Sequence, residues 1–143
     1  MKSCTFLERI WFGRTVSTSE HRPRILIADD HDDFSTLVKA YLAPQGVAVD
    51  TASTGYEALS LATQVVYDLI LVDIQMPGLD GYQVTTRLRA TGYDRPILAV
   101  TAHAMAPYLD EALRAGCDAV YTKPVSLSVL RAAILSSVAP TAP

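Results

Sequence analysis

The sequence predicts a three-layer α/β fold, in which a parallel sheet of five strands is covered by helices on both faces. Short apolar runs alternate with segments of helical periodicity from residue 24 onward. Several of these runs are apolar at every position, as expected for strands that are buried on both faces of a parallel sheet. The chain has 143 residues, 50% of them hydrophobic, which is enough for one domain with its own core.

Five apolar runs form the predicted strands. Their bounds, in chain order, are 25–28, 47–51, 69–72, 97–100 and 119–122. Helical segments lie between them and after the last one, so consecutive strands are expected to pair in parallel through right-handed crossovers. No internal repeat of 20–50 residues is evident beyond this alternation.

The first helix is predicted from apolar residues at i, i+3, i+4 and i+7, which lie on one helical face. These residues are Phe34, Leu37, Val38 and Tyr41. Pro44 and Gly46 are expected to end the helix. Asp32 and Asp33 precede it, and we expect one of them to cap it and both to favour its positive end.

The other four helices are recognised mainly by their ends. Thr54 and Glu57, three residues apart, form a capping-box pattern at the start of the second helix. The third follows a loop that contains a proline and two glycines. Pro107 suits the first turn of the fourth helix, and Gly116 suits its end. Ser126 is expected to cap the last helix.

The predicted domain spans residues 24–138, between an N-terminal extension, 1–23, and a C-terminal tail, 139–143. Four apolar residues of the extension have the spacing of a short amphipathic helix, namely Phe6, Leu7, Ile10 and Trp11. The polar stretch 15–23 has the composition of a linker. The extension is interpreted as a frayed or disordered leader, with a docking or homodimer helix and a vector-derived leader as alternatives.

Composition argues against several classes of protein. Residues 1–24 carry a net charge of +3 and the rest of the chain −6. An acidic body argues against nucleic-acid binding and is compatible with a cation site. No apolar stretch approaches the roughly 20 residues of a membrane span, and no secretory signal is evident. Cys4 and Cys117 are too few for a disulfide framework, so a cytoplasmic location is expected.

Polar residues follow the predicted strands at the edge where open parallel sheets bind ligands. They are Asp29 and Asp30 after the first strand, Asp73 after the third, Thr101 after the fourth and Lys123 after the fifth. Three carboxylates about 4 Å apart repel by roughly 4 kcal/mol per pair at an effective dielectric near 20. Such oxygen ligands suit Mg²⁺, an aspartate can become an aspartyl phosphate, and lysine and threonine can contact phosphoryl oxygens. Together these residues predict a phosphoryl-transfer site.

From Arg24 to about Val138 the chain resembles the receiver domain of two-component response regulators. The segments that carry the resemblance are ILIADDH (25–31), LILVDIQMPGLDGYQV (69–84), PILAVTAHAM (96–105) and GCDAVYTKPV (116–125). The resemblance implies a flavodoxin-like sheet of strand order 2-1-3-4-5. The second and third segments look more like receivers of hybrid sensor kinases than like receivers of transcription factors.

The resemblance also implies roles for the acidic residues. Asp73 would be the phosphoacceptor. Asp30, Asp73 and the backbone carbonyl of Gln75 would bind Mg²⁺ (or Mn²⁺) directly, and Asp29 would act mainly through metal-bound water. His31 is expected only to flank the acidic pair in a loop.

Further roles concern the phosphoryl group and the conformational switch. The resemblance implies that Thr101 and Lys123 contact the phosphoryl group and that the peptide bond after Lys123 is cis. Many receivers have an aromatic residue three positions before this lysine, but here that position is Val120 and Tyr121 follows it. Strand alternation sends these two side chains to opposite faces, so Tyr121 cannot take over an aromatic switch. His103 is interpreted as a residue that affects water access.

The expected function is that of a single-domain response regulator, a signalling phosphoacceptor and not a metabolic enzyme. It would accept a phosphoryl group on Asp73 from a histidine kinase or phosphotransfer protein, and catalyse only this transfer and slow dephosphorylation. It would then bind an unidentified downstream protein. A phosphorelay intermediate or phosphate sink is an alternative. A Mg²⁺-dependent phosphohydrolase of the haloacid-dehalogenase type is remote, because Asp29 and Asp30 are adjacent and no cap insertion is evident.

Overall fold

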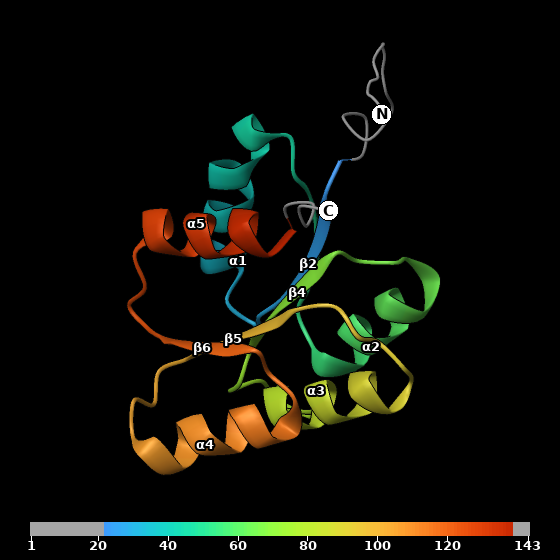
Figure 1. The fold of residues 1–143 in the computed structure, drawn as a ribbon, viewed down its shortest axis with the longest axis vertical. Coiled ribbons are helices and arrows are strands. Elements are labelled where there is room, and N and C mark those ends of the chain that lie inside the picture. The colour runs from blue at the N-terminus through green and yellow to red at the C-terminus, as the bar shows by residue number, and fades with distance from the viewer. Residues whose placement is uncertain (1–21, 139–143) are drawn as a thin grey trace, which may run out of the picture.

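The computed structural model describes residues 22–138, which form a five-stranded parallel sheet between two layers of helices (Figure 1). The strands are β2 (Arg24–Ala28), β3 (Ala48–Ala52), β4 (Leu69–Asp73), β5 (Ile97–Thr101) and β6 (Ala119–Thr122). The helices are α1 (Asp32–Leu42), α2 (Gly55–Gln64), α3 (Gly81–Ala90), α4 (Ala106–Ala115) and α5 (Leu127–Val138). A 3₁₀ turn, Ala43–Gln45, follows α1. No helix in these residues is long and apolar enough to cross a membrane.

The strand order across the sheet is β3-β2-β4-β5-β6, and every neighbouring pair is parallel. Counted in chain order this is 2-1-3-4-5, so the predicted flavodoxin-like topology is confirmed. The order places β2 and β4 side by side in the sheet. The carboxyl ends of these two parallel strands therefore lie next to each other at one edge. The predictions for the N-terminal extension and the C-terminal tail concern residues that lie almost entirely outside the described range.

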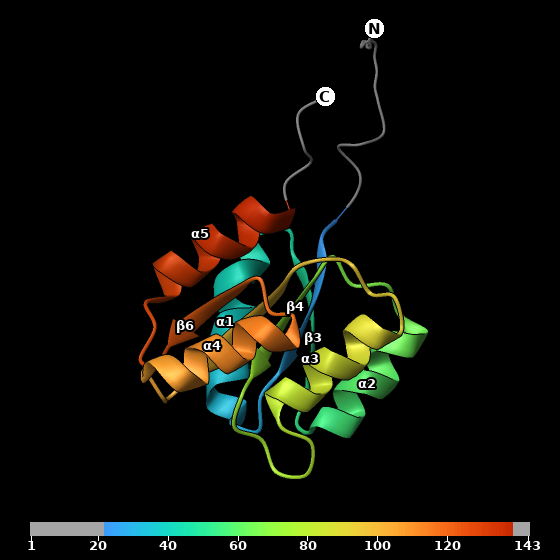
Figure 2. The same cartoon turned by 60° about the horizontal axis from the view of Figure 1, so that its bottom comes forward.

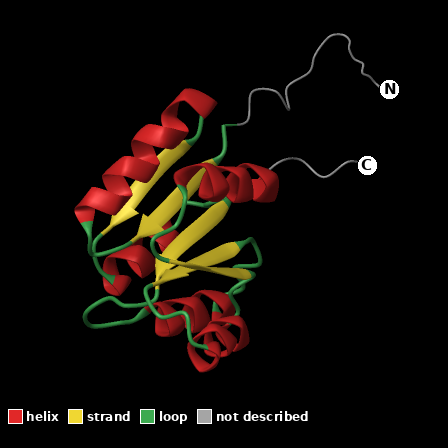
Figure 3. Cartoon of the chain, turned by 90° about the vertical axis from the view of Figure 1, so that its left-hand side faces the viewer, coloured by secondary structure: helices red, strands yellow, loops and turns green. Residues whose placement is uncertain are grey.

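Helices cover both faces of the sheet (Figure 3), and a hydrophobic core lies on each face. Alternate residues of each central strand enter each core, as the two-residue repeat of a strand requires. In β2, for example, Leu26 packs toward α2 and α3, whereas Ile25 and Ile27 pack toward α1 and α5. Helices α2, α3 and α4 lie next to one another on their face (Figure 2). Each fully buried leucine or isoleucine contributes about 1.5–3 kcal/mol, so the central strands are held rigidly.

The start of α1 differs from the expectation. Neither Asp32 nor Asp33 caps this helix: the cap position is His31, whose side chain makes no capping hydrogen bond. Both aspartates lie one step further on, in the first turn, where their charge still favours the positive end of the helix. The extended backbone of His31 ends the loop after β2 one residue earlier than the sequence suggested.

Most other predicted helix ends are confirmed. Thr54 Oγ1 accepts a hydrogen bond from the Glu57 N–H, although the Glu57 side chain accepts from Ser53 and not from Thr54. Gly116 ends α4 with a φ of 119°, a left-handed conformation that favours glycine. The Val129 N–H donates to Ser126 Oγ over 3.4 Å at the start of α5.

The loop from β4 to α3 returns tightly to the end of its own strand. A Cβ atom at Gly81 would lie 2.7 Å from the carbonyl oxygen of Asp73, so only glycine allows this approach. The Gly81 N–H donates to the Ile74 carbonyl over 2.8 Å. Asp80 and Gln83 form a full capping box at the start of α3. This end of β4 is therefore fixed from several sides.

Candidate functional site

The predicted site residues converge at the carboxyl edge of the sheet. Asp29 and Asp30 directly follow β2, Asp73 is the last residue of β4, and Thr101 is the last residue of β5. Lys123 directly follows β6, and its N–H donates to the carbonyl of Thr101 over 2.7 Å. The topology thus brings together residues that lie up to 94 positions apart in the sequence.

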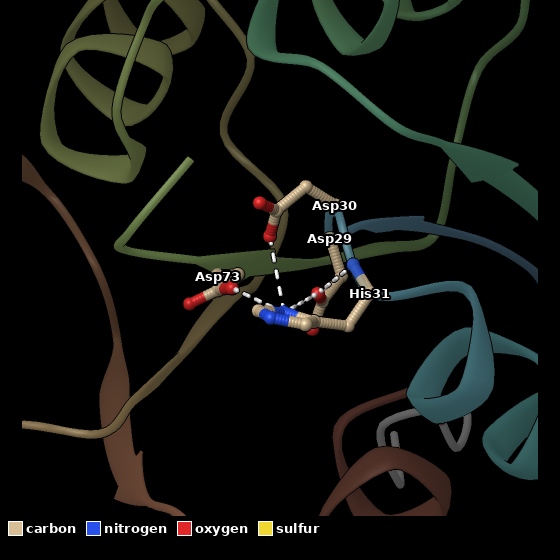
Figure 4. A group of neighbouring side chains, drawn as sticks. All are labelled: Asp29, Asp30, His31 and Asp73. Atoms are coloured by element: carbon tan, nitrogen blue, oxygen red, sulfur yellow. Dashed lines mark hydrogen bonds and ion pairs between the residues drawn. The ribbon is translucent and has the colours of Figure 1, made fainter. Parts of the chain in front are cut away.

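Three carboxylates form the centre of the site (Figure 4). Asp29 and Asp73 are almost completely buried, with 2% and 4% of their surface exposed, whereas 30% of the Asp30 side chain is exposed. Ligand atoms of these three residues and of His31 all lie within 4.8 Å of one another. Asp30 therefore provides the carboxylate that solvent reaches most easily.

Lys123 supplies the nearest permanent positive charge. Its Nζ lies 3.1 Å from Asp29 Oδ2 and 3.5 Å from Asp73 Oδ2, so it bridges the two buried carboxylates. The ammonium group also lies 4.8 Å from the centre of the Phe34 ring, a distance suited to a cation–π contact. One ammonium group cannot neutralise three carboxylates, so the site keeps an excess of negative charge.

The electrostatic environment raises the pKa of Asp73. Burial is the main cause, because it disfavours the charged form, and the nearby Asp29 carboxylate adds to the effect. The Gln75 N–H, which donates to Asp73 Oδ1 over 3.1 Å, and the Lys123 ammonium act in the opposite direction. A cation next to Asp73 would favour its ionised form, so the donor set fits a hard divalent ion such as Mg²⁺.

His31 is a site residue that the sequence analysis did not identify as one. Its Nδ1 lies 3.1 Å from Asp30 Oδ1, 3.2 Å from Asp29 Oδ1 and 3.9 Å from Asp73 Oδ2 (Figure 4). The sequence showed only that it follows the acidic pair. Its ring turns back over the carboxylates because its extended backbone lies at the junction between the loop and α1.

A second histidine connects the two loops beside Asp73. The Gln75 side-chain nitrogen lies 2.6 Å from His103 Nε2, and the His103 N–H donates to Thr101 Oγ1 over 3.1 Å. The His103 ring also stacks on Tyr108 of α4, with ring centres 4.7 Å apart. His103 thus links the β4–α3 loop, the end of β5 and the first turns of α4.

The residues of β6 have the predicted orientation. Val120 packs against the core on the α2–α3–α4 face, whereas Tyr121 packs against the core on the α1–α5 face. The Lys123–Pro124 peptide bond is cis, as the resemblance implied. Tyr121 is therefore separated from α4 by the sheet itself.

The family of the chain follows from comparison with known sequences. A family model described as the response regulator receiver domain matches residues 25–135. This chain belongs to the receiver domain family. Receiver domains are signalling phosphoacceptors of two-component systems that carry the phosphoryl group on an aspartate.

Curated relatives of this receiver domain include parts of sensor kinases. It is 39% identical over 122 residues to the sensor protein GacS of Pseudomonas syringae pv. syringae, covering 82% of this chain and 14% of that protein. It is 37% identical over 107 residues to the sensor histidine kinase RcsC of Salmonella typhimurium, covering 75% of this chain and 11% of that protein. The chain thus spans only a small part of the length of these relatives.

Solved receiver structures share the fold. The Francisella response regulator 1452 receiver domain aligns with a TM-score of 0.78 and 30% identity, covering 82% of this chain and 97% of that chain. The Vibrio cholerae chemotaxis protein CheY4 aligns with a TM-score of 0.77 and 26% identity, covering 82% and 99%. In both cases the alignment spans nearly all of the solved chain.

Proposed function

We propose that this receiver domain accepts a phosphoryl group on Asp73 from a phosphohistidine of a histidine kinase or phosphotransfer protein in the cytoplasm. The observation that carries the proposal is the position of the buried Asp73 carboxylate, 3.5 Å from the Lys123 ammonium and in one cluster with Asp29 and Asp30. Labelling with acetyl phosphate in Mg²⁺ tests it: phosphate in an acyl linkage, which hydroxylamine releases, is expected. Absence of such labelling would contradict the proposal.

The transfer exchanges one bond to phosphorus for another. An Asp73 oxygen attacks the phosphorus, the P–N bond to the donor histidine breaks, and the leaving nitrogen keeps the electron pair and takes a proton from solvent. The Lys123 ammonium, 3.5 Å from Asp73 Oδ2, and the Thr101 hydroxyl at the end of β5 would contact oxygens of the transferred group. Their role is to hold the phosphoryl group next to Asp73 and to stabilise the negative charge on its oxygens during the transfer.

The metal is assigned to the most exposed side of the site. Asp30, Asp73 and the backbone carbonyl of Gln75 would hold Mg²⁺ or Mn²⁺, with Asp29 acting mainly through a metal-bound water. A bound Mg²⁺ supplies positive charge to phosphoryl oxygens that would otherwise approach three carboxylates. The hydrogen bonds of Asp29 to Lys123 and to the His31 N–H support its indirect role, because both of its oxygens already have donors.

The two carboxylates after β2 should contribute unequally to metal binding. We expect Asp30→Ala to weaken Mg²⁺ binding by tenfold or more, about 1.4 kcal/mol, because it removes a direct ligand. Asp29→Ala should weaken it less, since its loss frees Lys123 without removing a direct ligand. Calorimetric Mg²⁺ titration of both variants measures the difference. Equal losses in the two variants would contradict the direct role of Asp30.

Phosphorylation is proposed to act on residues 102–108 and not on the side chain at position 120. Val120 is short, β-branched and stiff at χ1, so it cannot move as a bulky ring would. The start of α4 has no side-chain cap, whereas its far end is held by Arg89, whose guanidinium donates twice to the Gly116 carbonyl. We therefore assign the movement to the segment from His103 to Tyr108, which leads into α4.

Thr101→Ala is expected to separate labelling from this movement. The variant keeps Asp73 and Lys123, so it should still be labelled. It loses the hydroxyl that contacts the phosphoryl group and that accepts from the His103 N–H. Amide chemical shifts with and without beryllofluoride measure the movement in both proteins. A fixed 102–108 backbone in the wild-type protein, with a rotamer change at Val120, would show that the switch lies elsewhere.

A further inference from the structure

We propose that His31 Nδ1 is an additional ligand of the metal site, and that it makes the site prefer cations of the Ni²⁺, Co²⁺ and Zn²⁺ class over Mg²⁺. The inference rests on the proposed metal site and concerns its selectivity. Carboxylate and carbonyl oxygens suit Mg²⁺ and Mn²⁺, whereas imidazole suits the later transition metals. An imidazole added to an all-oxygen site therefore strengthens binding of the second group much more than of the first.

The distances around Nδ1 fit donors that share one ion. Two donors bound at about 2.1 Å lie roughly 3.0 Å apart at a right angle and roughly 3.4 Å apart in a tetrahedron. Nδ1 lies 3.1 Å from Asp30 Oδ1 and 3.2 Å from Asp29 Oδ1. Its separation from Asp73 Oδ2 is 3.9 Å, within the roughly 4.2 Å that two donors bound at about 2.1 Å can span, so Nδ1 can share one ion with Asp30 and Asp73, the two carboxylates proposed as direct ligands.

The two sides of Asp29 are divided between Lys123 and His31. The ammonium group contacts Asp29 Oδ2, while the imidazole and the His31 N–H face Oδ1. The Lys123 ammonium thus already balances part of the negative charge on the inner side of the carboxylate cluster. The side that His31 faces is the one where Asp30 reaches solvent, so an ion from solution arrives next to the imidazole.

The His31 ring can bind an ion at little conformational cost. Its side chain makes no capping hydrogen bond to α1, and 68% of it is exposed. Nδ1 is the ring nitrogen that faces the carboxylates, so it is the one that would bind an ion. The backbone is held by the N–H bond to Asp29 Oδ1, 2.7 Å long, which keeps the ring over the cluster.

Metal titrations of matched variants test the assignment. The tag-free, metal-stripped chain is titrated calorimetrically with Ni²⁺, Co²⁺ and Mg²⁺, and compared with His31→Asn. The control is His103→Asn, which removes an imidazole that faces the Gln75 side chain and not the carboxylates. We expect His31→Asn to weaken Ni²⁺ and Co²⁺ binding about tenfold or more, Mg²⁺ binding less than about threefold, and the control to keep its Ni²⁺ affinity.

Two outcomes would overturn the inference. Equal changes for all three ions would show that His31 does not select among them. Tighter binding of every ion in His31→Asn would show that the imidazole is a counter-ion that competes with metal. The visible absorption of bound Co²⁺ gives a second readout, because it should change when a nitrogen ligand is lost. Acetyl phosphate labelling of the wild-type protein in Mg²⁺ reports the proposed function separately, so the two can fail independently.

Discussion

Replacing Asp73 by asparagine is expected to abolish phosphate incorporation from acetyl phosphate in Mg²⁺. The neutral amide is a poor nucleophile, and the substitution also removes one of the carboxylates proposed to hold the metal. Asparagine has nearly the same shape as aspartate, so the buried position at the end of β4 is preserved. The measurement is the amount of hydroxylamine-sensitive phosphate per chain, which should fall at least about a hundredfold, or roughly 2.7 kcal/mol in the barrier.

The matched control for this variant is Asp33→Asn. Asp33 is an exposed carboxylate in the first turn of α1, close to the site in sequence but outside the carboxylate cluster. The Asp33→Asn variant loses the same charge as Asp73→Asn and should be labelled like the wild-type protein. Near-normal labelling of Asp73→Asn would show that another residue accepts the phosphoryl group.

The same substitution should make the metal-free protein more stable at neutral pH. Folding raises the pKa of Asp73 through burial and through the Asp29 carboxylate, so its ionised form costs folding free energy. Asp73→Asn removes this cost and should raise Tm measurably.

The stability difference between Asp73→Asn and the wild-type protein should depend on pH. Below the ordinary pKa of aspartate, about 3.9, Asp73 is protonated in both the folded and the unfolded chain, and asparagine gains nothing. The advantage of asparagine grows as the pH rises through the raised pKa of the folded state, and is complete above it. Thermal unfolding between pH 3 and 8, with EDTA, measures it. A lower Tm for Asp73→Asn at pH 7 would contradict this electrostatic explanation, and Mg²⁺ should reduce the difference.

The sheet and most of the site could be predicted from the sequence because both depend on the backbone. Strands such as β4 are apolar at every position up to the aspartate, and parallel topology then determines which strand ends meet. The positions of Asp29, Asp73 and Lys123 at the carboxyl edge of the sheet could be predicted from this topology alone. Their side chains could be placed because each directly ends or follows a strand.

The positions of His31 and His103 could not be predicted, because they depend on side-chain directions in loops. The ring of His31 lies over the acidic cluster because α1 begins at Asp32, one residue earlier than a cap at Asp32 would have placed it, which leaves His31 at the cap position. The contact between His103 and Gln75 joins loops 28 residues apart in the sequence. Neither contact leaves a periodic or spacing signal in the chain.

The 94-residue separation of Asp29 and Lys123 has a consequence for the protein during its synthesis. Domains generally fold as units, and synthesis delivers their N-terminal strands first. A nascent chain that has emerged only as far as β5 contains the aspartates and Thr101, but neither the lysine nor β6, which forms the edge of the sheet. Such a chain lacks the only ammonium group that the described residues place beside Asp73. The arrangement of charges at the carboxyl edge of the sheet is therefore complete only when the last strand and Lys123 have been translated.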